Sequence, residues 1–194
     1  NGTAVEHLLR TDYDMIGENL SVGGATMAAL SGSTNSHIVE QVTNISADTD
    51  VIILEGGVND FWSAASFGTY VGCSDTTTEL NIQTFCGALE TSLRWIRDNR
   101  PNIPVIYVLN HHIKGADYGA NADNHTFQDF RDVVIKASND YGFALARVDM
   151  TAFNTTINVN NYSTYSGDGC HPTDAGYRKW YLPEIVNAIQ RAFG

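Results

Sequence analysis

The sequence predicts an α/β fold in which a parallel sheet is covered by helices on both faces. Short apolar runs suited to buried strands occur at residues 15–22, 51–54, 105–109 and 143–148. Segments with helical periodicity lie between and after them, and such alternation is typical of βαβ units with parallel strands. The 194 residues are enough for a substantial core. We therefore expect a single domain over residues 1–194.

The helical segments are recognised by apolar residues that recur every three or four positions. A short helix is expected over residues 4–10. Two longer patterns are formed by Cys86, Leu89, Leu93 and Ile96, and by Phe127, Phe130, Val134 and Ala137. The last helix is expected from Thr173 to Phe193, with a kink or restart at Pro183 because proline lacks an amide hydrogen. The stretches 61–80 and 151–169 lack periodicity and are candidates for the walls of a site.

The composition excludes several classes of protein. Hydrophobic residues make up 43% and charged residues 17%, and no run of 18 apolar residues occurs, so we expect no membrane span. The formal net charge is −11, and the few lysines and arginines form no cluster that could neutralise several phosphates. We therefore expect no nucleic acid partner.

Cysteines and glycosylation motifs bear on the cellular setting. Cys73 and Cys86 flank the polar stretch CSDTTTELNIQTFC and either close a disulfide or remain reduced and buried, with Cys170 unpaired in both cases. N-x-[ST] motifs begin at Asn1, Asn44, Asn124, Asn154 and Asn161. Together with the acidic charge, these features favour an extracellular, secreted or virion-surface protein.

The stretch VIILEGGVND is the first signal of chemistry. A strand of buried type runs into a glycine turn, which allows the backbone to approach a ligand closely. The amide of Asn59 is a neutral donor suited to a developing oxyanion. The alternative is that Asn59 only caps the next element. A weaker signal of the same kind is ENLSVGGATM, a predicted strand that ends in Gly-Gly.

The stretch GDGCHPTDAGY places Asp168 three residues before His171. Pro172 disfavours helical geometry at His171 and holds it at the mouth of the last helix. Asp168 could accept a hydrogen bond from one ring nitrogen and leave the other as a general base. The alternative is that Asp168 and Thr173 cap a helix next to a surface histidine.

These three motifs, in this order and at strand ends, resemble those of the SGNH or GDSL-type serine hydrolases. This family includes esterases, lipases, acyl thioesterases and carbohydrate deacetylases. NLSVGGAT is similar to its second block, with Gly24 as the oxyanion-hole glycine. GVND matches the GxND block, with Asn59 as the oxyanion-hole asparagine, and DGCH matches the DxxH block. The resemblance implies that His171 is the general base and that Asp168 orients it.

The family's first block, the GDS motif that carries the nucleophilic serine, does not occur in the chain. Ser31 and Ser33 follow the second block and are poor substitutes, and Cys170 adjoins His171, where neighbouring side chains diverge. The resemblance implies a three-layer α/β/α fold with a flavodoxin-like sheet of order 2-1-3-4-5. The four strand runs correspond to strands two to five, so we expect the first strand and the serine upstream of Asn1, and the domain to be incomplete at its N-terminus.

The resemblance implies a serine esterase that works through an acyl-enzyme without a cofactor. The polar, acidic chain favours short acyl groups, acetyl above all, on a small-molecule or glycan ester. Trp62 and His111 are candidates for substrate binding, although core packing of Trp62 and a solvent position for His111 are alternatives. His111 and His112 are adjacent rather than spaced for a metal, so no metal site is expected. The alternative function is a noncatalytic carbohydrate-binding or adhesion module.

Overall fold

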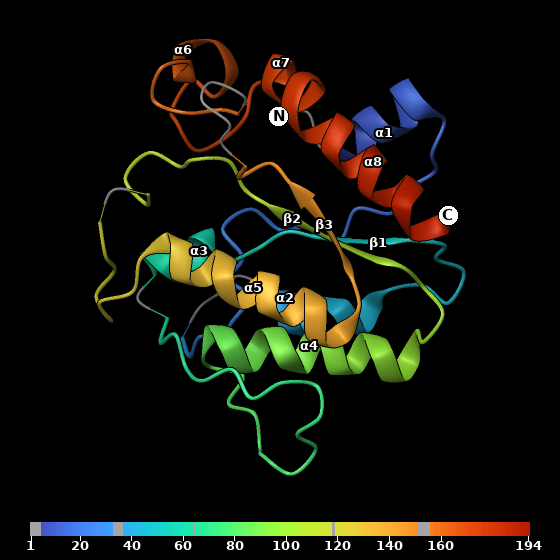
Figure 1. The fold of residues 1–194 in the computed structure, drawn as a ribbon, viewed down its shortest axis with the longest axis vertical. Helices are drawn as coiled ribbons and strands as arrows, with labels where there is room; N and C mark the ends of the chain where they lie inside the picture. The colour runs from blue at the N-terminus through green and yellow to red at the C-terminus, as the bar shows by residue number, and fades with distance from the viewer. Residues whose placement is uncertain (1–4, 33–36, 64, 118, 151–155) are drawn as a thin grey trace.

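The structure, a computed structural model, describes residues 5–32, 37–63, 65–117, 119–150 and 156–194. Its elements form three layers with a parallel sheet in the middle (Figure 1). Helices α1 (Val5–Tyr13) and α8 (Leu182–Phe193) cover one face of the sheet. Helices α2 (Ile38–Gln41), α4 (Phe85–Asn99) and α5 (Phe127–Tyr141) cover the other. The predicted α/β/α architecture is confirmed.

The sheet contains β1 (Ile52–Leu54), β2 (Val105–Leu109) and β3 (Ala144–Arg147), in the order β1-β2-β3. Both neighbouring pairs are parallel, with Ile52 opposite Val105 and Ile106 opposite Ala144. Three of the four predicted strand runs therefore form strands. The carboxyl ends of the strands lie at one edge of the sheet, where ligands bind in folds of this class.

The prediction of a strand at residues 15–22 was wrong. This segment has no helix or strand, and two of its apolar side chains reach solvent, with Ile16 99% and Val22 42% exposed. A strand needs a partner for its backbone hydrogen bonds. In the described part of the sheet, β1 is an edge strand and pairs only with β2, so no ladder reaches residues 15–22.

The first face of the sheet is packed by the two ends of the chain. Leu8 and Leu9 of α1 join the buried cluster that Ile185 and Ile189 of α8 form over Ile106. The last helical stretch begins as predicted, since the Thr173 hydroxyl caps it by accepting a hydrogen bond from the Gly176 amide at 3.1 Å.

That stretch contains α7 (Asp174–Gly176), the π-helical segment η2 (Tyr177–Tyr181) and α8, with Pro183 in the first turn of α8. Proline is tolerated there because the first amides of a helix have no partner within it. The predicted restart at Pro183 is confirmed.

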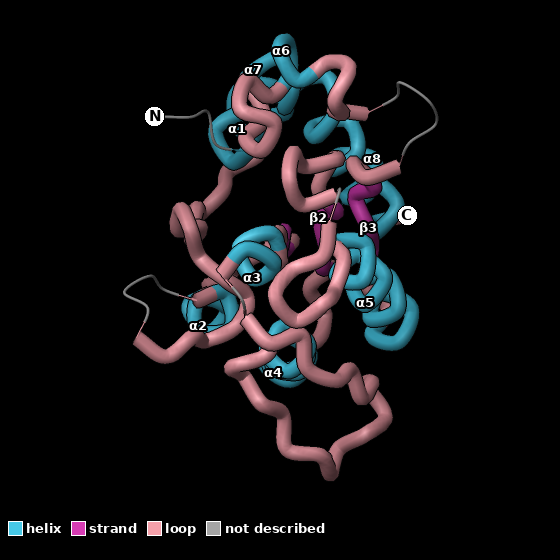
Figure 2. Tube along the Cα trace, turned by 90° about the vertical axis from the view of Figure 1, so that its left-hand side faces the viewer, coloured by secondary structure: helices cyan, strands magenta, loops and turns pink. Residues whose placement is uncertain are grey.

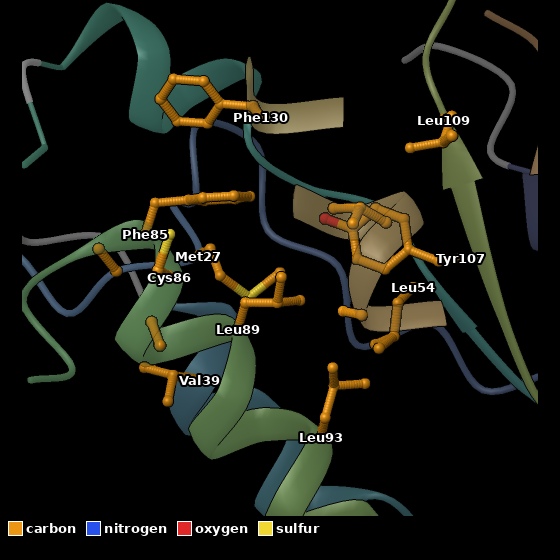
Figure 3. Packing of buried hydrophobic residues seen from close by; sticks show 14 of the residues in the cluster. Met27, Val39, Leu54, Phe85, Cys86, Leu89, Leu93, Tyr107, Leu109 and Phe130 are labelled. Atoms are coloured by element: carbon orange, nitrogen blue, oxygen red, sulfur yellow. The ribbon is translucent and has the colours of Figure 1, made fainter. Parts of the chain in front are cut away.

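The second face carries the larger core cluster, which Figure 3 shows around α4. Phe85 and Leu89 of α4 pack with Met27 and with Leu54 of β1. Threonine side chains cap both long helices by accepting hydrogen bonds from backbone amides, Thr84 in α4 and Thr126 in α5. These helices match the two predicted apolar patterns. A short 3-10 segment, η1 (Val42–Asn44), follows α2.

The long loop before α4 is tied down by a buried carboxylate. Glu90 of α4 is 0% exposed and accepts hydrogen bonds from the amides of Val71 and Gly72, both at 2.8 Å. Cys73 and Cys86 are separate thiols, so of the two alternatives the structure has the reduced form. Cys86 is buried, and its burial raises the pKa of the thiol to about 12.

Two short helices complete the carboxyl edge of the sheet. They are α3 (Val58–Trp62), directly after β1, and α6 (Tyr162–Tyr165). Figure 2 views the molecule from their side, with the loops in front of the strands. The Tyr162 hydroxyl donates to the His112 carbonyl at 2.7 Å, which ties α6 to the loop after β2. None of the described helices is long and apolar enough to cross a membrane.

Candidate active site

The structure brings Asp168 and His171 into direct contact. His171 Nδ1 lies 2.8 Å from Asp168 Oδ2. The other carboxylate oxygen, Oδ1, accepts from the backbone amides of Cys170 and His171, each at 2.8 Å. Because a carboxylate only accepts, Nδ1 is the protonated nitrogen, and Nε2 is then the one that can take up a proton.

The carboxylate of Asp168 stays ionised across the working range. Burial, the largest single effect, would raise its pKa, but hydrogen bonds from the His171 side chain and from the His171 and Cys170 amides outweigh it and hold the pKa well below the usual range. A permanently charged acceptor fixes the tautomer and the ring direction of His171. The His171 side chain itself is 83% exposed in the described chain.

The turn that carries this pair is held by the loop after β2. The Lys114 amide donates to the Gly169 carbonyl at 2.9 Å, and Gly169 has a φ of +84°. A Cβ at Gly169 would lie 2.6 Å from Lys114 Cβ, so this close approach requires glycine. The Ser166 hydroxyl donates to the His171 carbonyl at 3.1 Å. The turn is therefore fixed from both sides.

The GVND motif forms the second half of the site. Gly57 has a φ of +99° and begins α3, whose Phe61 packs edge-on against Phe127 and Phe130 with ring centroids 5.8 and 6.0 Å away. This anchor holds Asn59 at the first turn of α3. Asn59 Nδ2 donates to the Ala25 carbonyl at 2.9 Å, so the motif is bound to the segment that contains Gly24.

Gly24 lies on the exposed side of that segment with a φ of +81°. Left-handed backbone of this kind favours glycine and turns the peptide groups away from their usual directions. The hydrogen bond from Asn59 to the Ala25 carbonyl thus places Asn59 next to the segment of Gly24. The two residues that the resemblance assigns to the oxyanion hole are therefore neighbours.

Glu55 connects the two halves, and the sequence-based prediction missed it. It follows β1 directly, and its carboxyl interacts electrostatically with His171, Cys170 and Tyr177. Removal of water around the carboxyl raises its pKa from 4.5 to about 7, and the charge of His171 offsets part of this rise. The residue is nevertheless exposed to solvent, which weakens this effect. Glu55 therefore titrates next to His171 near neutral pH.

The raised pKa of Glu55 makes the stability of the chain depend on pH. Between pH 4.5 and about 7 the unfolded chain ionises before the folded chain, so the free energy of unfolding falls as the pH rises. Glu55→Gln removes this loss. We expect it to raise the free energy of unfolding at pH 8 by about 1 kcal/mol, well below the ~3 kcal/mol of an unscreened shift because the side chain is partly exposed.

Urea denaturation of both proteins at pH 4 and pH 8 measures this effect. At pH 4 the wild type and the variant should be equally stable. An equal gain at both pH values would show that the effect comes from packing rather than from ionisation.

The structure corrects the expectation that His111 lines a substrate cleft or lies in solvent. Its side chain is buried, with 0% exposure, and Nδ1 lies 2.6 Å from the Tyr181 hydroxyl. Burial lowers the pKa of His111 to about 4, so the ring is neutral. It supports the site from the interior. The sequence pattern could not distinguish these positions, because His111 lies two residues beyond the end of β2, where the side-chain direction no longer follows the strand.

Trp62 lies at the end of α3, three residues after Asn59, and is 47% exposed. The core alternative considered for this side chain therefore does not apply. In the described ranges, no group of three histidine, cysteine or acidic side chains could hold a metal ion. The residues at this edge are suited to proton transfer and to hydrogen bonding of a negative oxygen.

The fold and the site define an α/β/α protein with an aspartate–histidine pair and an asparagine at the carboxyl edge of a parallel sheet. The model of the GDSL-like Lipase/Acylhydrolase family matches residues 1–179. The chain belongs to this family, and in general terms it is an ester hydrolase. No curated protein sequence matches the chain.

Solved structures show the same fold. A Lactobacillus plantarum protein is 26% identical with a TM-score of 0.75, over 98% of this chain and 88% of its own. An extracellular lipase from Streptomyces rimosus is 18% identical with a TM-score of 0.58, over 95% and 86% of the two chains. Phospholipase A1 from Streptomyces albidoflavus NA297 is 18% identical with a TM-score of 0.53, over 78% and 76%. For the two Streptomyces enzymes the likeness concerns the fold alone.

Proposed function

We propose that this protein is a serine esterase that hydrolyses short-chain carboxylic esters through an acyl-enzyme. The observation that carries the proposal is the 2.8 Å contact between His171 Nδ1 and Asp168 Oδ2, in a turn held by further hydrogen bonds at Asp168, Gly169 and His171. His171 is the general base and Asp168 orients it. The nucleophile in this proposal is the serine of the family's first block, which residues 1–194 do not contain, and residues 1–194 belong to one domain with it.

The reaction follows from these roles in two steps. The serine oxygen attacks the ester carbonyl while His171 Nε2 takes its proton, and His171 then gives this proton to the departing alcohol. Water attacks the acyl-enzyme in the second step, again through His171, and releases the acid and the serine. The ionised carboxylate of Asp168 stabilises the imidazolium that forms each time.

The negative oxygen of the tetrahedral intermediate requires donors in fixed positions. Asn59 Nδ2 carries two hydrogens, and one of them donates to the Ala25 carbonyl at 2.9 Å. This bond sets the plane of the amide, so that the other hydrogen can donate to the oxyanion. The backbone amide of Gly24 is the second donor, and that of the serine is the third.

The substrate class is inferred from the surroundings of the site. The chain carries a net charge of −11, and Trp62, an exposed aromatic side chain, lies three residues from Asn59. Exposed aromatic rings are platforms on which sugars stack. We therefore favour acetyl or other short acyl groups on a carbohydrate, and an extracellular enzyme.

A panel of esters tests this function. The full-length polypeptide is given p-nitrophenyl acetate, acetylated xylan or chitin oligomers, and p-nitrophenyl palmitate. Release of acetate with a kcat/KM well above that for palmitate supports the proposal. A preference for palmitate contradicts the short-chain assignment. Binding of glycans without any hydrolysis contradicts the esterase and supports the noncatalytic module.

A further inference from the structure

Asp60, the last residue of GVND, lies in the interior rather than at the site surface. Its side chain is 0% exposed. Asp60 Oδ2 accepts a hydrogen bond from the Met27 amide at 2.7 Å, and Oδ1 accepts one from the Ala28 amide at 2.9 Å. The carboxylate is therefore bound by both oxygens to the segment that follows Gly24.

Burial of the Asp60 carboxylate costs free energy of folding. Burial is the largest effect on it and raises its pKa above the usual value, although the amides of Ala28 and Met27 act in the opposite direction. A buried, charged acceptor with no arginine or lysine among its bonded partners stabilises the fold poorly. The hydrogen bonds from the two backbone amides have a different effect, because they fix the position of the loop that contains these amides.

The segment of residues 24–28 has no helix or strand of its own. The carbonyl of Thr26 accepts from the amide of Ile38 at 2.9 Å, and the Met27 side chain packs beside Leu89 (Figure 3). The amides of Met27 and Ala28 have Asp60 as their acceptor. The preceding residue of the motif, Asn59, binds the same segment at Ala25.

We propose that Asp60 is a positioning residue for the oxyanion hole. Its carboxylate holds the segment of residues 24–28 against α3, and this sets the distance between the Gly24 amide and the Asn59 side chain. Asp60 touches neither the substrate nor the reacting atoms. The proposal rests on the proposed function in one respect, the role of Gly24 and Asn59 as oxyanion donors.

The hydrogen bonds of Asp60 make Asp60→Asn an informative variant. Both oxygens of Asp60 face backbone N–H groups, so in Asp60→Asn one of them is replaced by an NH2 group in either orientation of the amide. That NH2 faces an N–H donor and cannot bond to it, and the segment must move. A displacement of about 1 Å of a catalytic group can cost about 100-fold in rate.

Glu90 offers a matched control elsewhere in the chain. It is also 0% exposed, and its carboxylate also accepts from two consecutive backbone amides, those of Val71 and Gly72. Glu90→Gln therefore causes the same loss of an acceptor, together with the loss of a 4.0 Å ion pair with Arg94, in a loop that contains none of the proposed donors. A purely structural role for Asp60 predicts the same kinetics for both variants.

The test compares the two variants in the full-length polypeptide with p-nitrophenyl acetate, at a temperature where both show the native circular dichroism spectrum. We expect Asp60→Asn to lower kcat by about 100-fold with KM changed by less than about threefold, and Glu90→Gln to change kcat by less than about threefold. Equal losses of kcat in the two variants would overturn the proposal. If Asp60→Asn does not fold, Asp60→Glu replaces it, with at least about a tenfold loss of kcat expected.

Amide hydrogen exchange separates this inference from the proposed function. In Asp60→Asn we expect the Met27 and Ala28 amides to exchange at least about tenfold faster than in the wild type, with the Leu89 amide of α4 unchanged. Unchanged exchange at Met27 and Ala28 would overturn the positioning role even in an active enzyme. Faster exchange in Asp60→Asn, together with a wild-type protein that shows no esterase activity, would support the positioning of the segment and contradict the proposed function.

Discussion

Replacing His171 by alanine is expected to lower kcat for ester hydrolysis by the full-length polypeptide by about 10⁴-fold, with little change in KM. The imidazole is the group that moves the proton in both steps, and no other histidine contacts Asp168. The fold should be retained, because the His171 side chain is 83% exposed and its hydrogen bond to Asp168 joins two residues of the same turn. Steady-state kinetics with p-nitrophenyl acetate measure the loss.

The exposure of His171 provides a second measurement. Imidazole added to the buffer can enter the space left by the side chain, so we expect it to restore part of the activity of His171→Ala. The matched control is His7→Ala, since His7 is an exposed histidine on α1 whose Nδ1 faces Arg10 rather than a carboxylate. An active His171→Ala variant, or an equal loss in His7→Ala, would contradict the assignment of the general base.

Replacing Asn59 by alanine is expected to lower kcat by about 100- to 1,000-fold, because one donor to the oxyanion is lost. KM should change little, since the donor acts mainly on the transition state. Stability should fall by about 1 kcal/mol through the loss of the hydrogen bond to the Ala25 carbonyl.

Asn99→Ala is the control for this variant. Asn99 Nδ2 also donates to a backbone carbonyl, that of Trp95 at 2.8 Å, at the far end of α4. We expect a comparable change in stability from Asn99→Ala and an unchanged kcat. If Asn59→Ala retains the wild-type kcat, Asn59 is only a cap of α3, which was the alternative that the sequence left open.

The sequence allowed a good prediction of the fold because its signals are local. The apolar spacing of α4 and α5 and the three strand runs depend on neighbouring residues, and each forms the predicted element. The run at residues 15–22 was the exception. Its apolar residues are suited to a strand, but a strand exists only with a partner strand, and pairing depends on the whole sheet.

The candidate site was predicted in part for the same reason. Asp168 and His171 are three residues apart, and their 2.8 Å contact follows from the turn itself. The bonds of Asp60 to Met27 and Ala28 span more than 30 residues, and the coupling of Glu55 to His171 spans more than 100. No local pattern carries such information. The burial of His111 likewise depends on Tyr181, which lies far along the chain.

Covalent labelling tests the central claim most directly, which is that these residues serve a nucleophilic serine. The full-length polypeptide is treated with a fluorophosphonate, and the adduct is located by mass spectrometry of its peptides. The account predicts one labelled serine, in a GDS block outside residues 1–194, and no labelling in His171→Ala. Absence of an adduct in the wild type, or an adduct on a residue between 1 and 194, would contradict it.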